Sequence, residues 1–509
     1  MRINNIFKNI NVSFLYSFLN LIFSFILRTI FIHKLGTEYL GLNSILANIL
    51  SMLSIAELGI GSAIGFSLYK PISQNNTKKI NALMQYYKKS YQIIGFVILV
   101  LGICLVPFLD AFITNITAYD YIYFIYLLYL LNTVIGYFFT YKRTLIIANQ
   151  KNYVLTKYLM IFKLITYFSQ MFILIFTSNY ILYIIAQFTI SLLENLYVNY
   201  QINKQYPYLN NKEVEELTKE EKSVITKNVK AMLFHKIGDY CINSTDNLII
   251  AHFINITIVG IYSNYYTLIY NVNQFLTLIF QAASASFGNL IASTDKNTVY
   301  TRFKTFNFLA FWLFGFATLC LYFLMTPFIE HIWLGKDYVI SNSVIMIVML
   351  NFFFVSMRVP LGIVKSAAGV YDQDKFIPFL QSLVNLIVSI VLVQKYGLVG
   401  VFIGTLASSV LVVFVARPYV VYKYVFEKPL INYFKLFFQY FFSLLFYAFF
   451  IHIIFNYIYL SNEVFNFIFK CIILCIIPNV LNYLFFRNTD EFKDLINMGK
   501  RILKRRKHG

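Results

Sequence analysis

The chain has 509 residues, of which 59% are hydrophobic and only 13% are charged. This composition excludes an ordinary soluble domain and leaves room for about fourteen membrane-spanning helices. The net charge of +20 does not predict a nucleic-acid partner, because the basic residues are dispersed among short polar segments, as the positive-inside rule expects of a membrane protein.

Apolar segments of spanning length recur from the beginning of the chain. The sequence predicts six spans in a first lobe at residues 1–202, at about 11–33, 40–68, 90–112, 118–140, 153–176 and 180–202. A hydrophilic stretch follows at 203–229, where Thr218 and Glu221 form a capping-box pattern. We therefore expect a cytoplasmic linker that contains a short helix.

The second half of the chain repeats the arrangement. It predicts a second lobe at 230–424, two further helices within 425–487 and a basic cytoplasmic tail at 488–509 suited to anionic lipid headgroups. Its predicted spans are at about 230–252, 257–290, 304–328, 339–364, 375–395, 398–422, 432–457 and 464–486. With this even number, both termini lie in the cytoplasm and most Lys and Arg residues fall on that side.

Two short segments relate the lobes to each other. GTEYLGLNSIL matches NITIVGIYSNYYTLI, with Gly41 aligned on Gly260 and Ser44 on Ser263, and each segment joins the first two spans of its lobe. Related lobes are typical of pseudo-symmetric transporters. The predicted fold is therefore an all-α integral membrane protein, with two six-helix lobes around a central cavity and two C-terminal helices.

Ionisable residues inside the spans are the candidate functional residues, because a bilayer tolerates them chiefly where they pair or meet water. The seventh span carries a polar stripe on one helical face, made of Lys236, Asp239, Asn243, Asp246 and Asn247. We expect this stripe to line an aqueous cavity. The structural alternative is a Lys236–Asp239 pair that neutralises itself inside a closed bundle.

Acidic residues in the spans are fewer than elsewhere in the chain. Glu57, Glu194, Asp239 and Asp246 could pair with intramembrane cations or titrate in an ion-coupled cycle. For Glu57 a packing role is equally consistent, since Gly61 and Gly65 nearby are spaced for close helix contact.

Enzymatic and metal chemistry find little support in the sequence. The five cysteines lie in apolar segments, so we expect neither a disulfide framework nor a metal site, and no cofactor. Asp372 and Asp374 form a D-x-D in a short predicted loop without a nucleotide-binding domain, and hydrolase and phosphate-loop motifs are missing. We therefore expect a protein that is not an enzyme.

Six segments carry a family pattern: LGTEYLGLNSIL, IAELGIGSAIGFSLYKPI, STDNLIIAHFINITIVGIYSNYYTLI, QAASASFGNLIA, IWLGKDYVI and KYGLVGVFIGTLASSVL. In order and spacing they resemble the polysaccharide-transporter branch, the Wzx-type flippases, of the multidrug/oligosaccharidyl-lipid/polysaccharide exporter superfamily. The resemblance implies a V-shaped pair of lobes. It also implies movement of an undecaprenyl-diphosphate-linked oligosaccharide across the bacterial cytoplasmic membrane for capsule, O-antigen or exopolysaccharide assembly, alongside glycosyltransferases and a polymerase.

A diphosphate substrate needs cations along its path. Arg28, Lys163 and Lys236 are the candidates, and Arg28 is favoured because a guanidinium can hold two phosphate oxygens at once. A proton or Na⁺ is the expected coupling ion. Two alternatives remain: an ion-coupled multidrug exporter, whose pocket should be acidic overall, and a polysaccharide polymerase, which should carry a large arginine-bearing outer loop.

Overall fold

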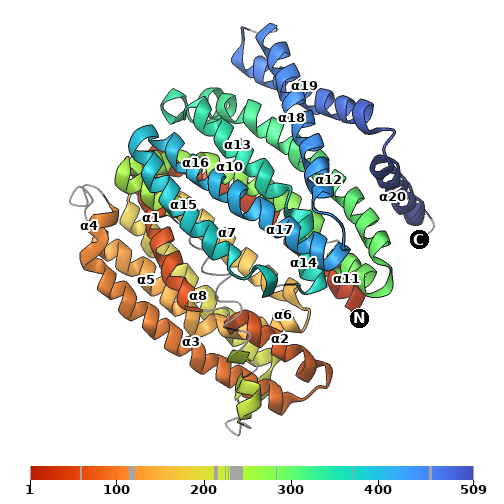
Figure 1. The fold of residues 1–509 in the computed structure, drawn as a ribbon. Coiled ribbons are helices and arrows are strands. Elements are labelled where there is room, and N and C mark those ends of the chain that lie inside the picture. Colours follow the sequence, from red (N-terminus) through yellow and green to blue (C-terminus); the bar gives the residue numbers. More distant parts are fainter. Residues whose placement is uncertain are drawn as a thin grey trace. The chain divides into compact units, whose positions relative to one another are not determined.

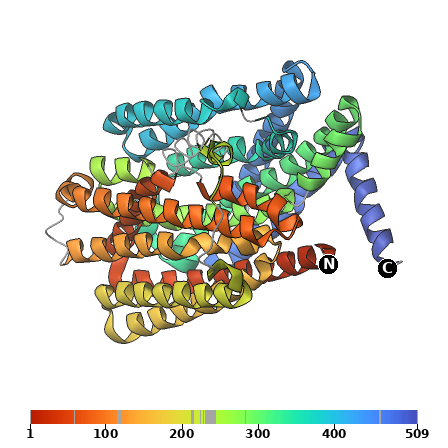
Figure 2. The ribbon, with the colours of Figure 1, turned by 90° about the horizontal axis from the view of Figure 1, so that it is seen from below.

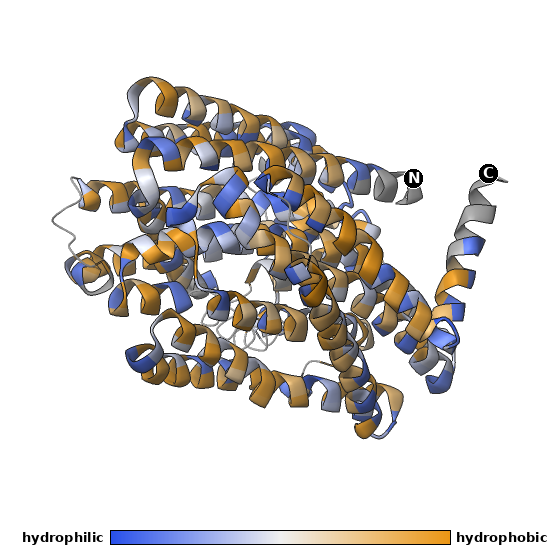
Figure 3. Cartoon of the chain, turned by 90° about the horizontal axis from the view of Figure 1, so that it is seen from above, coloured by the Kyte–Doolittle hydropathy of each residue, from blue (hydrophilic) through white to orange (hydrophobic). Residues whose placement is uncertain are grey.

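The computed structural model describes residues 2–57, 60–113, 121–210, 216–223, 225–226, 229, 245–281, 284–370, 372–457 and 461–507. These residues are helical and contain no strand (Figure 1). They divide into two compact units, Met1–Ser263 and Asn264–Gly509. Apolar residues predominate in the long helices (Figure 3), as expected of helices that cross a membrane.

The N-terminal unit consists of long helices that run side by side, coloured red to yellow in Figure 2. Its helices are α1 (Arg2–Leu53), α2 (Ile60–Ser73), α3 (Thr77–Leu105), α4 (Leu109–Phe112), α5 (Ile122–Phe139), α6 (Arg143–Ala148), α7 (Asn152–Thr177), α8 (Tyr180–Gln205) and the first turns of α10 (Ile256–Gln281). Helix α1 packs against α7, α7 against α8, and α5 against α3 and α8.

The C-terminal unit contains the remaining turns of α10 and ten further helices. They are α11 (Ser284–Ser293), α12 (Lys296–Pro327), α13 (Asn342–Ser356), α14 (Val359–Ala368), α15 (Ile377–Tyr396), α16 (Leu398–Ser408), α17 (Phe414–Val421), α18 (Ile431–Tyr457), α19 (Glu463–Phe486) and α20 (Asp490–Lys507). Helices α15 and α16 pair closely, and α12 contacts α13, α19 and α20.

The predicted all-α membrane architecture is confirmed, although the count of fourteen spans is approximate. Eleven helices within the described residues are long and apolar enough to cross a membrane. At 52 residues α1 is too long for one crossing. Gly36 interrupts it with non-helical angles (φ 85°, ψ 177°), so the predicted first and second spans meet at this kink. The predicted seventh span lies mostly outside the described residues.

Candidate functional site

A polar column runs through the N-terminal unit where α1, α7 and α8 pack together. Its members are side chains that are polar or charged within spans of membrane length: Tyr16, Asn20, Arg28, Lys163, Tyr167, Gln170, Tyr183, Gln187 and Glu194. The amphipathic spacing of these residues on three neighbouring helices brings them to one interface. This column contains three of the predicted site residues.

Arg28, on α1, lies at one end of the column. Its guanidinium donates a hydrogen bond of 2.5 Å to the Ser263 hydroxyl on the first turns of α10, and that hydroxyl donates to the Gly260 carbonyl at 2.6 Å. Tyr183 of α8 interacts electrostatically with Arg28. The half-buried guanidinium is thus tied to α10 and interacts with α8.

Neutral hydrogen bonds make up the middle of the column. The Tyr167 hydroxyl donates to the Asn20 side-chain carbonyl at 2.6 Å, which ties α7 to α1. One turn further, the Gln170 amide donates to Gln187 at 3.2 Å and ties α7 to α8. Buried polar groups are stable only when bonded in this way, so these pairs fix the register of the three helices.

The other end of the column carries a lysine and a glutamate. The Lys163 ammonium lies 5.0 Å from the centroid of the Tyr167 ring, a cation–π contact. Glu194 on α8 interacts electrostatically with Lys163 but forms its ion pair with Arg143, at 3.0 Å. The Arg143 guanidinium also donates to the Asn195 side chain at 2.8 Å. The described residues give Lys163 no hydrogen bond, so its charge is only partly compensated.

The other predicted site residues are placed differently. Glu57 ends a 3₁₀ turn (Ser54–Glu57) and accepts a hydrogen bond of 2.7 Å from the Tyr91 hydroxyl of α3. A side chain on Gly61 would meet Glu57 and the Tyr87 and Tyr91 hydroxyls, so this region is closely packed. The geometry favours the packing interpretation of Glu57, while its titration during transport stays a prediction.

The predicted stripe of the seventh span is described only at its end. Asp246 and Asn247 are half-buried in a helix at 245–253. Lys236, Asp239 and Asn243 lie outside the described residues, so the stripe and the alternative Lys236–Asp239 pair both stay predictions.

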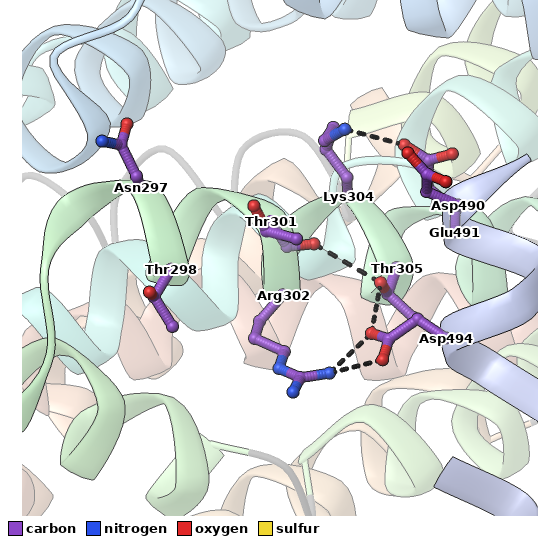
Figure 4. Close-up of a pocket in the computed structure, with 9 residues that line it drawn as sticks. All are labelled: Asn297, Thr298, Thr301, Arg302, Lys304, Thr305, Asp490, Glu491 and Asp494. Atoms are coloured by element: carbon purple, nitrogen blue, oxygen red, sulfur yellow. Dashed lines mark hydrogen bonds and ion pairs between the residues drawn. The ribbon is translucent and has the colours of Figure 1, made fainter. Parts of the chain in front are cut away.

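A cavity of about 460 Å³ that is open to the surface lies between one end of α12 and the first turns of α20. Figure 4 shows Arg302 and Lys304 of α12 facing the acidic residues of α20. Arg302 holds both carboxylate oxygens of Asp494, at 2.7 and 2.6 Å, and Lys304 pairs with Glu491 at 2.9 Å. Because each of its two cations is held by an acid of α20, we interpret this cavity as a helix-docking contact.

The described residues contain no group of three or more His, Cys, Asp or Glu placed to hold a metal ion. Asp374 of the D-x-D is buried in an ion pair with Lys365. A carboxylate held in this way is not presented to a metal-bound nucleotide, so its role in this structure is to connect the loop to α14.

A family model described as "Polysaccharide biosynthesis protein" matches residues 6–285, which is more than half of the sequence. The chain belongs to this family. The match includes the whole polar column, and it confirms the membership that the sequence segments predicted. The comparison with curated proteins gives no match.

Solved structures of the same fold include a lipid II flippase and MATE family transporters. The lipid II flippase MurJ, in an inward closed conformation, aligns with a TM-score of 0.69 and 15% identity, over 94% of this chain and 99% of the flippase. An inward-facing multidrug resistance MATE family transporter of the MOP superfamily gives 0.60 and 12%, over 79% and 94%. A Vibrio cholerae MATE transporter gives 0.57 and 16%, over 84% and 99%. At these identities the likeness shows the fold, and the chain is a multi-pass membrane protein of that fold.

Sequence reasoning missed several members of the column. Arg143 was not singled out from the sequence, although Glu194, the partner of this arginine, was singled out. Gln170 and Gln187 are uncharged amides inside apolar spans, and such residues commonly bond across membrane helices. A search for amides as well as charges would have found them.

Proposed function

We propose that the chain is a flippase that moves an undecaprenyl-diphosphate-linked oligosaccharide repeat unit from the inner to the outer leaflet of the bacterial cytoplasmic membrane by alternating access. Its membership of the polysaccharide biosynthesis family supports this assignment. The likeness of its fold to a flippase of another lipid-linked saccharide, lipid II, supports it as well. The product would serve capsule, O-antigen or exopolysaccharide assembly.

The observation that carries the proposal is the pair of cations in the polar column. Arg28 donates to a neutral hydroxyl, and Lys163 lies against a tyrosine ring beside a carboxylate that Arg143 already neutralises. Cations in a low-dielectric region attract a diphosphate strongly. Two of them at different depths along α1 and α7 would hold the negative charge at successive positions.

The predicted topology is part of the proposal. Both termini would lie in the cytoplasm, and the lipid-linked substrate would come from glycosyltransferases on that side and pass to a polymerase outside. Lys236, from the predicted stripe, would add a third cation to the path.

A multidrug exporter is the second candidate, because two of the structural neighbours are MATE transporters. Such a pocket should be acidic overall to attract cationic compounds. The column instead couples its acid, Glu194, to an arginine. Efflux of a cationic dye by vesicles that contain the purified protein would favour this second function.

Alanine at Arg28 or Lys163 tests the flippase proposal. Each charge-assisted contact contributes about 1.5–3 kcal/mol, so each substitution should reduce surface polysaccharide by about tenfold or more. Arg28→Lys should restore export only in part, because an ammonium cannot bind two phosphate oxygens in a fixed geometry. The measurement is surface polysaccharide in cells that lack the native protein, normalised to the amount of variant in the membrane.

The matched control is Lys157→Ala. Lys157 lies on the same helix as Lys163 but is exposed, so its loss should leave export unchanged. Wild-type export by the double variant Arg28→Ala/Lys163→Ala would contradict the proposed path.

A further inference from the structure

Two arginines of the C-terminal unit lie on helices or helix ends that contact each other. Arg358 sits at the junction of α13 and α14 and is 4% exposed. Arg417 lies on α17 and is half-buried. Helices α14 and α17 pack side by side (Figure 1), and the two guanidinium groups interact electrostatically. Two like charges that interact, one of them buried, repel each other, and an anion bound between them would stabilise both.

The hydrogen bonds of Arg358 orient it but do not neutralise it. Its two terminal nitrogens donate to the Ser409 carbonyl and hydroxyl, both at 3.0 Å. Ser409 begins a π-helical turn, Ser409–Val413, a widened backbone that occurs often at functional sites. The Arg358 Nε has no partner in the described part of the chain.

A buried tyrosine is a third hydrogen-bond donor in this unit. Tyr433 of α18 is fully buried, and the described residues give its hydroxyl no hydrogen bond. Its ring lies 5.9 Å from that of Phe414, which precedes Arg417 by about one helical turn. Tyr433 interacts electrostatically with both arginines. The three side chains therefore interact electrostatically with one another, and the ion pairs of the described residues include none of them.

We propose that Arg358, Arg417 and Tyr433 form a binding site for a phosphate group within the C-terminal unit. The Arg358 Nε would donate a hydrogen bond to one phosphate oxygen, and the Tyr433 hydroxyl would donate to a second. Half-buried Arg417 would bind the phosphate from the more accessible side. A tetrahedral oxyanion accepts several such bonds at once. This inference is independent of what the protein transports.

The depth of the site limits the source of the phosphate. Arg358 and Arg417 lie about two thirds of the way along their spans, Asn342–Ala368 and Leu398–Phe426, and Tyr433 is near the start of the next one, Ile431–Tyr457. All three are therefore displaced toward the same membrane surface, the cytoplasmic one in the predicted topology. The group could belong to a lipid headgroup or to a free phosphate from that side.

Binding to the purified full-length protein distinguishes the two sources. Native mass spectrometry with phosphatidylglycerol, and thermal unfolding with added inorganic phosphate, should each be measured on wild type, Arg417→Gln and Tyr433→Phe. Selective retention of phosphatidylglycerol identifies a headgroup, and a raised Tm with inorganic phosphate identifies a free anion. In either case we expect binding to weaken about tenfold in both variants, as for the loss of one charge-assisted bond.

Arg487→Gln is the matched control, because Arg487 is an exposed arginine in the same unit and its loss should not change binding. Arg417→Gln and Tyr433→Phe keep the Arg358 packing, so the test does not depend on a variant that removes a buried charge. Failure of wild type to bind either probe, or equal binding by wild type and Arg417→Gln, would overturn the site.

Discussion

At the scale of single residues, one carboxylate connects the short helix of the linker to α3. Glu221 accepts a hydrogen bond from the Thr218 backbone amide at 3.0 Å, while the Thr218 hydroxyl accepts one from the Glu221 amide at 3.3 Å. The same carboxylate pairs with Lys79 near the start of α3. The hydrogen bond from Lys79, with a further one from Thr218, lowers the pKa of Glu221 below its ordinary value.

A lowered pKa fixes the direction of the pH dependence. The carboxylate stabilises the attached linker above its ordinary pKa, and the contribution is lost only as the pH falls through the lowered value. Glu221→Gln should therefore increase amide hydrogen exchange in the helix at 219–223 by up to about fivefold, since an exposed pair contributes at most about 1 kcal/mol. The increase should be the same from about pH 5 to about pH 8, where the carboxyl stays ionised.

Hydrogen exchange read by mass spectrometry checks this prediction. Glu220→Gln is the control, because Glu220 is the exposed neighbour and should exchange as wild type does. Equal exchange in both variants would mean that the Lys79 pair does not hold the linker.

The positions of charges inside the spans could be predicted better than their pairing. Arg28, Lys163 and Glu194 were found because a charge inside an apolar span is conspicuous in the sequence. Their partners Ser263 and Arg143 lie 235 and 51 residues away along the chain. Helical periodicity predicts which face a side chain occupies but not which helix that face meets, so these pairs could not be predicted.

At the scale of elements, the two segments that relate the halves of the sequence touch each other. A side chain on Gly41 of α1 would lie 2.1 Å from the Ile256 carbonyl oxygen of α10, and one on Gly260 would lie 2.1 Å from the Thr37 carbonyl oxygen. The two helices therefore cross backbone to backbone, as small residues allow in membrane proteins. The sequence aligned these glycines but did not predict their contact.

Alanine at Gly41 or Gly260 should force this crossing apart. Because the obstructing atoms belong to the backbone, we expect each substitution to destabilise the protein by about 3 kcal/mol, the upper part of the range for overpacking. Thermal unfolding of the purified protein is the measurement.

Gly136 of α5 supplies the control, since a side chain there would meet nothing within 4 Å. Gly136→Ala should be neutral or stabilising by about 0.5–1 kcal/mol, because alanine favours a helix. If Gly41→Ala and Gly260→Ala unfold at the temperature of Gly136→Ala, the close crossing is wrong.

At the scale of the whole molecule, most spans could be predicted because hydropathy alone determines them. The expected spans at 153–176 and 432–457 correspond to α7 (Asn152–Thr177) and α18 (Ile431–Tyr457). The tail was predicted only as a basic segment, whereas α20 is a helix whose Phe492 stacks on Trp312 of α12. Its regular spacing of apolar residues could have predicted this helix. Its docking partner could not be found in that way.

Energy coupling also belongs to this scale. The membrane potential favours outward movement of a diphosphate by about 2.3 kcal/mol per charge per 100 mV, yet a cationic path must be reset after release. We predict that uptake of a proton or Na⁺, by Asp239 or Glu57, performs the reset. Flipping in vesicles should therefore slow several-fold when both ion gradients are collapsed.

The electrical potential must be held constant in that experiment, so that only the chemical gradients change. An unchanged rate without pH and Na⁺ gradients would show that the cycle needs neither ion.

The docking of α20 imposes an order on biosynthesis. Asp494 lies 192 residues after Arg302, with which it pairs. The spans between these two residues are therefore synthesised before Asp494 exists. During that time the cations of α12 must remain hydrated or be neutralised by lipid headgroups. The C-terminal unit therefore reaches its final arrangement only after α20 has been synthesised, and a chain that stops after α19 would leave Arg302 and Lys304 without these acidic partners.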